Sequence, residues 1–428
     1  MELAEKIVDR VERDKDQIVD FLRQMVRIPS VTGNEGALAQ FVAESLSSMG
    51  LQVDSWELNA KELEARYPGY FVNWGHPYQA RPNVVGIWRG RRGGRSLLLN
   101  GHLDVVSPEP VSAWRHDPWA GEIEDGKLFG RGTCDMKGGN AAMIMALRVL
   151  REEGVELKGD VIIESVIEEE GPGNGTLACQ ARGYRADAGI VAEPTDLEIH
   201  VAATGFVGAM IVIEGKPAHV AMAFDGVNAI EKSMTIVKAI QEFRDWRLKS
   251  SSHPLYQRYR EVAGSSPVLS MERIDSKNMS EVPSKVMLLT ASIVMPGETP
   301  QAVSQQMEEW IRRAAAEDPW LKDNPPQISC ILVGARSHSV EICVDHPLIS
   351  TLSDALRRVR PEEPIIAGFP APADWQHLNI IEPRTPTVGF GPGKVKQAHT
   401  VDEFVLLDDV IDCTKVLALT IVQWCGVS

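Results

Sequence analysis

Apolar residues recur first at helical spacing and then at strand spacing along the first half of the chain. Over residues 18–26 they recur every three or four positions, which predicts an amphipathic helix that stops near Pro29. A second helix is expected over residues 37–49, ahead of Gly50. Strand and helix signals then alternate to about residue 204. This alternation predicts an α/β fold, a mixed sheet with helices on both faces.

The second half of the chain predicts a separate α+β segment. Its elements are an alternating strand at 209–214, a helix at 227–242, strands around 284–294 and a helix at 301–315. The α/β pattern then resumes, with a helix at 347–358, a strand at 386–390 and a helix at 407–424. We therefore predict two domains: a discontinuous catalytic domain, 1–205 and 337–428, and an inserted lid, 206–336. Hinges are expected near Thr204-Gly205 and Gly334.

Composition places the chain among soluble globular proteins. Hydrophobic residues make up 44% and charged residues 24% of the 428 positions. No run of about 18 apolar residues and no basic, apolar leader is seen, so neither a membrane partner nor secretion is predicted and the cytoplasm is expected. The net charge of −15 argues against a nucleic-acid partner. The six cysteines lack CxxC spacing and are expected to be reduced and buried.

Candidate metal chemistry begins at the strand-like run 97–106. His102 and Asp104 are two positions apart, so on a strand they would share a face. One side chain can then bind a metal while the other accepts the remaining imidazole N–H and sets the tautomer. A buried His-Asp pair without a metal is the alternative.

Four more candidate ligands follow strands or glycine-rich turns. Asp135 stands between a glycine-rich turn and a helical pattern, where an N-cap aspartate is the alternative. Residues 168–170 are three glutamates that end a buried strand; they repel one another unless a cation is near, although a solvated acidic loop would also explain them. Glu193 ends another apolar strand and His399 lies in a late loop. Carboxylates and imidazoles together suit zinc or a similar ion, and paired ions can generate hydroxide at neutral pH.

Six sequence blocks resemble the M20 family of metallopeptidases and amidohydrolases. They occur in family order over nearly the whole chain: GHLDVV, GRGTCDMKGG, EEEGPGNGTLA, AEPT, GKPAH with GVNAI, and FGPG with AHTVDEF. The resemblance implies that Asp135 bridges two metal ions, that His102 and Glu193 complete one ion, and that His399 and a glutamate of the acidic run complete the other.

The acidic run has to be aligned with the family pattern, which usually reads Asp-Glu-Glu. Counting back from Gly175 assigns Glu170 as the metal ligand and Glu169 as the general base, with Glu168 in the place of the usual aspartate. A shift by one residue stays open.

The predicted reaction is hydrolysis of a carbon–nitrogen bond in a small molecule. Two ions, with zinc expected and manganese or cobalt open, supply a metal-bridging hydroxide and polarise the amide carbonyl. Glu169 takes the proton and passes it to the leaving nitrogen. No GxSxG motif or supported Cys-His pair competes. The expected activity is deacylation of an N-acyl amino acid or of an N-acyl or N-formyl heteroaromatic amine. A dipeptidase or carboxypeptidase, an aromatic aminohydrolase and a catalytically silent metal-binding protein are the alternatives.

His219 carries the prediction about partners. It follows an alternating strand within the GKPAH block. The resemblance implies that this lid histidine reaches the active site of a second subunit and stabilises the oxyanion, which predicts a homodimer. An ordinary surface histidine at a strand end is the alternative.

Substrate specificity rests on weaker sequence signals. Residues 292–298 contain no arginine, where many exopeptidases of the family carry a carboxylate-binding one, which argues against glutamate carboxypeptidase-like specificity. The chain is more similar to the acetylornithine deacetylase-like branch, which includes a formylaminopyrimidine deformylase. Four aromatic residues could line a pocket for a flat group or belong to the core: Trp114, Trp119, Trp375 and Phe224.

Overall fold

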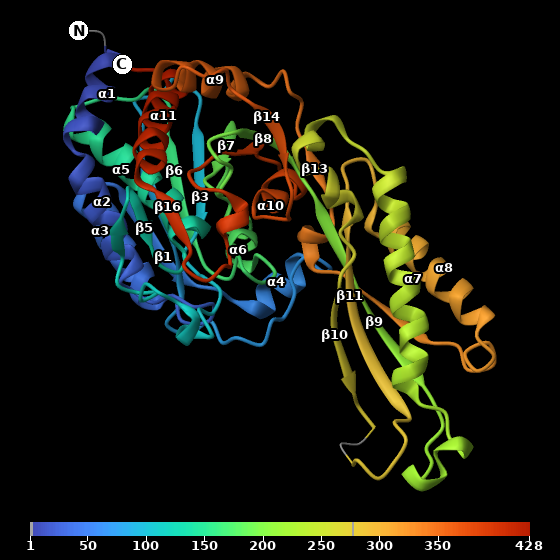
Figure 1. The fold of residues 1–428 in the computed structure, drawn as a ribbon. Coiled ribbons are helices and arrows are strands. Elements are labelled where there is room, and N and C mark those ends of the chain that lie inside the picture. The colour runs from blue at the N-terminus through green and yellow to red at the C-terminus, as the bar shows by residue number, and fades with distance from the viewer. Residues whose placement is uncertain (1–2, 276–277) are drawn as a thin grey trace. The chain divides into compact units, whose positions relative to one another are not determined.

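The computed structural model describes residues 3–275 and 278–428 and divides the chain into two compact units (Figure 1). The main unit comprises the residues up to 202 together with 341–369 and 373–428. The inserted unit comprises 203–340 and the short segment 370–372. These limits differ by a few residues from the predicted boundaries, and no sequence signal indicated that 370–372 would join the inserted unit.

A mixed sheet of nine described strands forms the centre of the main unit. In spatial order the strands are β1 (Gln52–Glu57), β2 (Pro82–Trp88), β6 (Val161–Val166), β3 (Leu97–His102), β7 (Ala188–Val191), β15 (Thr387–Gly389), β8 (Ile199–Ala203) and β13 (Val340–Glu341), with β14 (Ile366–Phe369) paired to β8. The neighbours β6, β3, β7 and β15 run parallel. Their carboxyl ends therefore meet at one edge, the usual location of ligand sites in α/β sheets.

Helices cover both faces of this sheet, as predicted. On one face, α3 (Gly36–Ser48) and α5 (Gly138–Glu152) place Leu46 and Met143 against the glycines of β2 and β3. On the other face, α6 (Asn174–Arg182) places Thr176 3.0 Å from Asn100, and α10 (Trp375–Ile380) packs against β15. The strands β3 and β6 are buried along their whole length, because both of their faces are covered.

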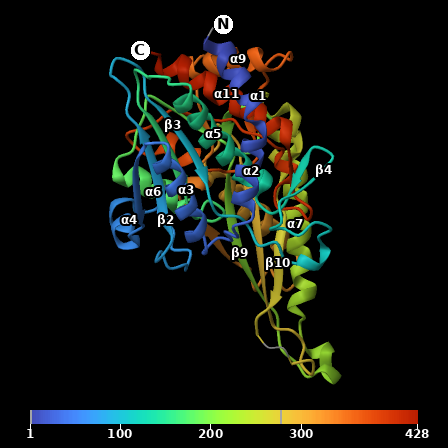
Figure 2. The ribbon, with the colours of Figure 1, turned by 90° about the vertical axis from the view of Figure 1, so that its left-hand side faces the viewer.

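The remaining elements of the main unit lie around this core. The helices are α1 (Leu3–Arg13), α2 (Lys15–Val26), α4 (Ala60–Arg66), α9 (Pro347–Val359) and α11 (Leu407–Cys425); α1, α2 and α11 pack against α5 (Figures 1 and 2). A small sheet has the order β16 (Phe404–Leu406), β5 (Lys127–Phe129), β4 (Glu122–Glu124). The helices predicted at 37–49, 347–358 and 407–424 are α3, α9 and α11, with ends that differ by one residue.

The inserted unit packs two helices on a four-stranded antiparallel sheet. Its strands are, in spatial order, β10 (Val268–Arg273), β11 (Lys285–Val294), β9 (Gly205–Glu214) and β12 (Gln327–Ile331), and its helices are α7 (Ala229–Ser250) and α8 (Pro300–Glu317). Alternate residues of β11 are buried, so one face of the sheet meets the helices. The helix predicted at 227–242 is α7, which continues for eight more residues to Ser250.

Sequence signals explain where these two helices begin. Asn228 accepts a hydrogen bond from the backbone N–H of Ile230 at the start of α7, and Thr299 accepts one from Ala302 at the start of α8. Pro300 occupies the first turn of α8, where a missing N–H costs nothing. Among the described residues, no helix has the length and hydropathy that a membrane span requires.

Phe243 is expected to be a main source of stability in the inserted unit. This residue of α7 is fully buried in the core shared with α8 and the sheet, and its ring lies 6.0 Å from that of Trp246 and 6.4 Å from that of Trp310. Phe243→Ala should lower the free energy of unfolding by about 3–5 kcal/mol because it opens a cavity. Denaturant unfolding followed by tryptophan fluorescence measures the change. Lys238→Ala, an exposed change on the same helix, should cost less than about 0.5 kcal/mol; equal losses would contradict this account.

Candidate metal centre

His102, the last residue of β3, is buried and points both ring nitrogens at oxygen atoms. Its Nε2 lies 3.0 Å from Oδ1 of Asp135, and its Nδ1 lies 2.8 Å from the backbone carbonyl oxygen of Asp104. The Asp104 carboxylate is farther from Nδ1, at 3.7 Å. The prediction that this carboxylate sets the imidazole tautomer is therefore wrong, because the strand ends at His102 and the main chain of Asp104 supplies the acceptor instead.

The Asp104 carboxylate instead holds the turn that carries the acidic run. Its Oδ1 accepts the backbone N–H of Glu169 at 2.9 Å, and its Oδ2 accepts that of Glu170 at 3.0 Å. The hydroxyl of Thr32 donates a third hydrogen bond at 3.0 Å. A fully buried carboxylate thus orients the two glutamates through their main chain.

Asp135 directs its two carboxylate oxygens at two different histidines. Oδ1 lies 3.0 Å from Nε2 of His102, and Oδ2 lies 3.4 Å from Nε2 of His399. The same nitrogen of His399 lies 2.9 Å from Oε2 of Glu170. A carboxylate between two imidazoles has the geometry expected of a bridging ligand.

Glu193, just beyond β7, completes the cluster from the next parallel strand. Its Oε1 is buried 3.9 Å from Nε2 of His102 and has no hydrogen-bond partner among the described residues. Oε2 of Glu169 lies at the same distance from that nitrogen. A buried carboxylate oxygen without a partner costs free energy unless a cation neutralises it.

Two triads in this cluster have donor atoms close enough for one ion. In one, atoms of His102, Asp135 and Glu170 all lie within 4.8 Å of one another; in the other, atoms of His102, Glu169 and Glu193 do. The grouping differs from that implied by the resemblance, because Glu169 is a candidate donor and His399 is in neither triad. The register within 168–170 therefore stays a prediction.

The electrostatics of the cluster reflect an excess of buried negative charge. Burial and the charge of Asp135 raise the pKa of Glu170 to about 7 and that of Glu193 well above its ordinary value. Burial lowers the pKa of His102, but the hydrogen bond to Asp135 and the charges of the surrounding carboxylates together outweigh burial and raise that pKa well above its ordinary value. Hydrogen bonds to Asp135 and Glu170 raise the pKa of His399 to about 11. Imidazole and carboxylate donors with this charge balance fit divalent zinc, manganese or cobalt.

Glu403 belongs to the site and was not singled out from the sequence. It is fully buried, and its Oε1 accepts the backbone N–H groups of Cys134 at 2.9 Å and of Asp135 at 3.1 Å. Its Oε2 forms an ion pair with Arg131 at 2.5 Å. The signal was present in the AHTVDEF block, where Glu403 is an acidic residue just ahead of a strand. Glu403 fixes the main chain that presents Asp135.

The cysteines divide into buried and exposed groups. All six are free thiols; Cys134, Cys179, Cys413 and Cys425 are buried, as predicted, whereas Cys330 and Cys343 are exposed. The Cys134 thiol donates to the carbonyl of Lys394 at 3.3 Å, and burial raises its pKa. Cys134 therefore packs beside Asp135 as a protonated thiol.

Of the four aromatic residues that could line a pocket or belong to the core, Trp375 belongs to the core, because it is only 1% exposed and packs edge-on against Phe369 at 5.1 Å. Trp114 and Trp119 are half-buried in the main unit, with the cations of Arg131 and Lys137 over their rings. Phe224 is 78% exposed and belongs to the inserted unit. Of these four aromatic residues, only Trp375 is therefore assigned to the core.

His219 also belongs to the inserted unit, as predicted, and not to the cluster of the main unit. It is exposed, and its Nδ1 accepts the N–H of Ala221 at 3.2 Å at the start of a short 3₁₀ segment, Val220–Asp225. The imidazole Nε2 is left for another contact.

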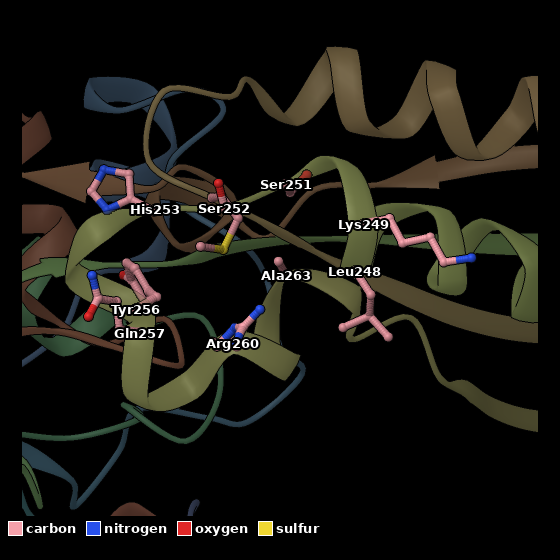
Figure 3. A pocket seen from close by; sticks show the side chains of 10 residues that line it. Leu248, Lys249, Ser251, Ser252, His253, Tyr256, Gln257, Arg260 and Ala263 are labelled. Atoms are coloured by element: carbon pink, nitrogen blue, oxygen red, sulfur yellow. The ribbon is translucent and has the colours of Figure 1, made fainter.

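The inserted unit contains a cavity of about 190 Å³ that involves neither His219 nor the predicted metal ligands (Figure 3). It lies between the end of α7, with Lys249, and the segment Pro254–Gly264, with Tyr256 and Arg260. None of the predicted metal ligands lines it. The cavity is therefore not the candidate metal centre.

Comparison with known proteins agrees with the geometry of the centre. The sequence matches the profile of peptidase family M20/M25/M40 over residues 98–423, which is more than half of the chain. The protein belongs to this family. The match spans the strands and loops that carry every residue of the cluster and the inserted unit with His219.

Two curated relatives of this M20 protein have the same name. The N-formyl-4-amino-5-aminomethyl-2-methylpyrimidine deformylase of Bacillus subtilis is 28% identical over 440 residues, covering 97% of this chain and 96% of the relative. That of Halalkalibacterium halodurans is 26% identical, covering 99% and 98%. Both names agree with the predicted class, a hydrolase of carbon–nitrogen bonds other than peptide bonds.

Solved structures share the two-unit fold. The dipeptidase Dug1p of Saccharomyces cerevisiae has a TM-score of 0.76 at 15% identity, covering 99% of this chain and 98% of its own. Human carnosine dipeptidase 1 has a TM-score of 0.72 at 18% identity, covering 99% and 100%. At these identities the likeness establishes the α/β fold and says nothing of the substrate.

Replacement of Glu403 should weaken metal binding without unfolding the protein. Glu403→Ala removes the acceptor for two backbone N–H groups at Asp135, so we expect about 10- to 100-fold lower metal affinity. Chelator competition with zinc measures the affinity, and circular dichroism checks the fold. Glu122→Ala is the control, because it changes an exposed acidic residue of the small sheet whose strand β16 directly follows Glu403. Wild-type affinity in Glu403→Ala would show that Asp135 needs no such support.

Proposed function

We propose that this M20 protein is a two-metal amidohydrolase that removes a small acyl group from the nitrogen of an amino acid or a heteroaromatic amine. The observation that carries the proposal is the buried cluster of carboxylates and imidazoles at the carboxyl ends of parallel strands, with the unpartnered oxygen of Glu193. The deformylase names of two relatives that align over nearly the whole chain support the acyl-removing reaction.

The proposed ligand assignment is based on Asp135, whose carboxylate lies between two histidines. His102 and Glu193 would hold one ion, Glu170 and His399 the other, and Asp135 would bridge them. When bound, the two ions supply an activated water and polarise the acyl carbonyl. A Bacillus subtilis protein of the M20 family with a similar fold is described as a dinuclear metal-binding peptidase, which supports two ions.

Glu169 is the proposed general base. Its backbone N–H donates to the Asp104 carboxylate, and its own carboxylate lies 3.9 Å from the same nitrogen of His102 that Glu193 approaches. From there it accepts the proton of the attacking water and passes it to the leaving nitrogen, which turns a poor leaving group into a neutral amine.

A peptidase is the main competing function, because the solved neighbours include dipeptidases. A substrate panel separates the two: N-formyl, N-acetyl and N-succinyl amino acids, N-formyl aromatic amines and dipeptides, each with metal-loaded protein and a chelated control. Chelator-sensitive release of a free amine from acyl compounds supports the proposal. Turnover confined to dipeptides would replace it, and turnover of none despite bound metal would favour a binding protein.

A homodimer is part of the proposal, with His219 acting on the acyl oxygen in the active site of a second subunit. Within the inserted unit β10 pairs with β11 alone among the described strands, so its outer edge has free backbone groups. Exposed Leu269 and Met271 lie on this strand, and exposed Met234 lies on α7. Ser233 of α7 contacts Met271 at 3.6 Å, so strand edge and helix form one apolar surface suited to a second copy.

Separate substitutions of the proposed base and of the proposed ligand should distinguish the loss of catalysis from the loss of metal binding. Glu169→Gln is expected to lower kcat by about 10²–10⁴-fold with two metals retained, because only the proton acceptor is lost. Glu170→Gln is expected to lose metal as well as activity. Elemental analysis and deacylation assays measure both. The reverse pattern, with metal lost from Glu169→Gln only, would shift the register by one residue.

Mixed dimers test whether His219 acts across subunits. His219→Ala should lower kcat strongly while keeping its metal. Random mixing of His219→Ala with Glu169→Gln subunits should restore about a quarter of wild-type activity, since half of the dimers gain one complete site. Light scattering gives the oligomeric state. A dimer without restored activity would mean that His219 serves its own subunit or none.

A further inference from the structure

Residues 70–81, between α4 and β2 in the main unit, form a segment rich in planar side chains that we call the aromatic loop. It reads Tyr-Phe-Val-Asn-Trp-Gly-His-Pro-Tyr-Gln-Ala-Arg. Two contacts clamp it against the acidic run and the segment that follows: the Tyr78 hydroxyl donates to Oε2 of Glu168 at 2.8 Å, and Asn174 donates to the carbonyl of Val72 at 2.9 Å. The loop is therefore fixed beside the proposed base and ligand.

Glu168 is the anchor of this clamp. It is fully buried and also accepts a hydrogen bond from Asn174 at 2.9 Å, while Arg81 lies 3.9 Å from its other oxygen. Its place beside Glu169 thus links the aromatic loop to the catalytic turn. The glutamate that departs from the usual Asp-Glu-Glu pattern has a defined use here, in holding the loop.

Trp74 lies face-on over the residue that follows Glu170. A Cβ built on Gly171 would lie 3.3, 3.4 and 3.4 Å from Nε1, Cδ1 and Cε2 of Trp74, three atoms of one five-membered ring. The face of the indole therefore covers the side of Gly171 from which a side chain would project. Trp74 is nonetheless 47% exposed, so much of this large apolar ring is left uncovered.

An uncovered indole at such a position suits a planar partner. Aromatic rings stack on tryptophan with a gain beyond their buried area, and a ring held by its neighbours loses little entropy on binding. The one arginine of the loop, Arg81, is not available to an amino-acid carboxylate, because it is buried and bound through two nitrogens to Glu35 at 2.5 and 2.7 Å. The loop contains no lysine.

We infer that Trp74 is a specificity-determining residue that stacks on the flat amine half of the substrate, so that N-acyl derivatives of amines that carry an aromatic ring are preferred to N-acyl amino acids. The inference rests on the proposed deacylase function and narrows its substrate class. Trp74 takes no part in the chemical step, so its loss should act on substrate binding and not on kcat.

Two substrates with the same carbon skeleton test the contribution of the flat ring. N-formylbenzylamine and N-formylcyclohexylmethylamine carry the same formamide, but the six-membered ring is aromatic and flat in the first and saturated and puckered in the second. Wild type should prefer the aromatic compound. Trp74→Ala should raise its KM by roughly tenfold, the scale of one aromatic stacking contact, and leave the KM of the saturated compound within about twofold. The kcat values and metal content should stay near wild type.

Matched variants show whether stacking is responsible. Trp74→Phe should recover most of the aromatic preference, because a flat ring remains. Gly171→Ala should reproduce a smaller part of the Trp74→Ala effect, because its methyl group displaces the indole. Trp246→Ala removes another partly exposed indole, from the inserted unit, and should leave both KM values unchanged.

Two results would overturn the inference while leaving the deacylase intact. One is an equal loss for both substrates in Trp74→Ala, which would mean that Trp74 only supports the loop; the other is no change for either. If wild type hydrolyses neither compound nor any other acyl amine, the proposed function fails instead. Calorimetric binding of free 4-amino-5-aminomethyl-2-methylpyrimidine then decides: at least about tenfold weaker binding to Trp74→Ala upholds the stacking role, and equal or undetectable binding to both proteins rejects it.

Discussion

The main unit has to bury several carboxylates close together near the ends of β6, β3 and β7, and the rest of its structure depends on this constraint. Asp135, Glu169 and Glu193 place carboxylates within 4 Å of one imidazole nitrogen, that of His102. In a dry interior such a group is costly unless protons or cations compensate it. The parallel strands of the mixed sheet, covered on both faces, form the rigid frame that keeps these side chains from separating or turning to solvent.

The frame acts on the main chain more than on the side chains. Asp104 and Glu403 are buried carboxylates outside the proposed ligand set, and each accepts two backbone N–H groups from a segment that carries functional residues. Gly139 adds a steric condition, because a Cβ there would lie 2.0 Å from the carbonyl oxygen of Ala192. This close approach sets α5 against the strand end that leads to Glu193. The main chain that carries the proposed ligands is thus held in place by residues outside the ligand set.

The difference between the cluster residues and the residues that hold their main chain explains what the sequence could and could not reveal. The proposed ligands His102 and Glu193 are polar residues at the ends of apolar strands, so the hydrophobic pattern singles them out as candidates, and the resemblance to the M20 family suggests their roles. The partners behind them depend on atoms that pattern does not encode: whether His102 bonds the carbonyl or the carboxylate of Asp104 is decided by where β3 ends. Glu403 lies 268 positions from Asp135 and meets its backbone only through the fold. For Trp375 the sequence left both core and pocket open, with the core favoured, and its packing against Phe369 places it in the core.

The cluster itself does not select a substrate. Two ions with a carboxylate base can serve any compact amide, and the fold is shared with dipeptidases while the curated relatives are deformylases. Discrimination has to come from groups that touch the part of the substrate distant from the scissile bond. In the main unit the aromatic loop meets that condition, because Glu168 and Asn174 tie it to the catalytic turn while Trp74 keeps much of its ring uncovered. Specificity can therefore change through this loop while the charge balance that holds the cluster stays intact.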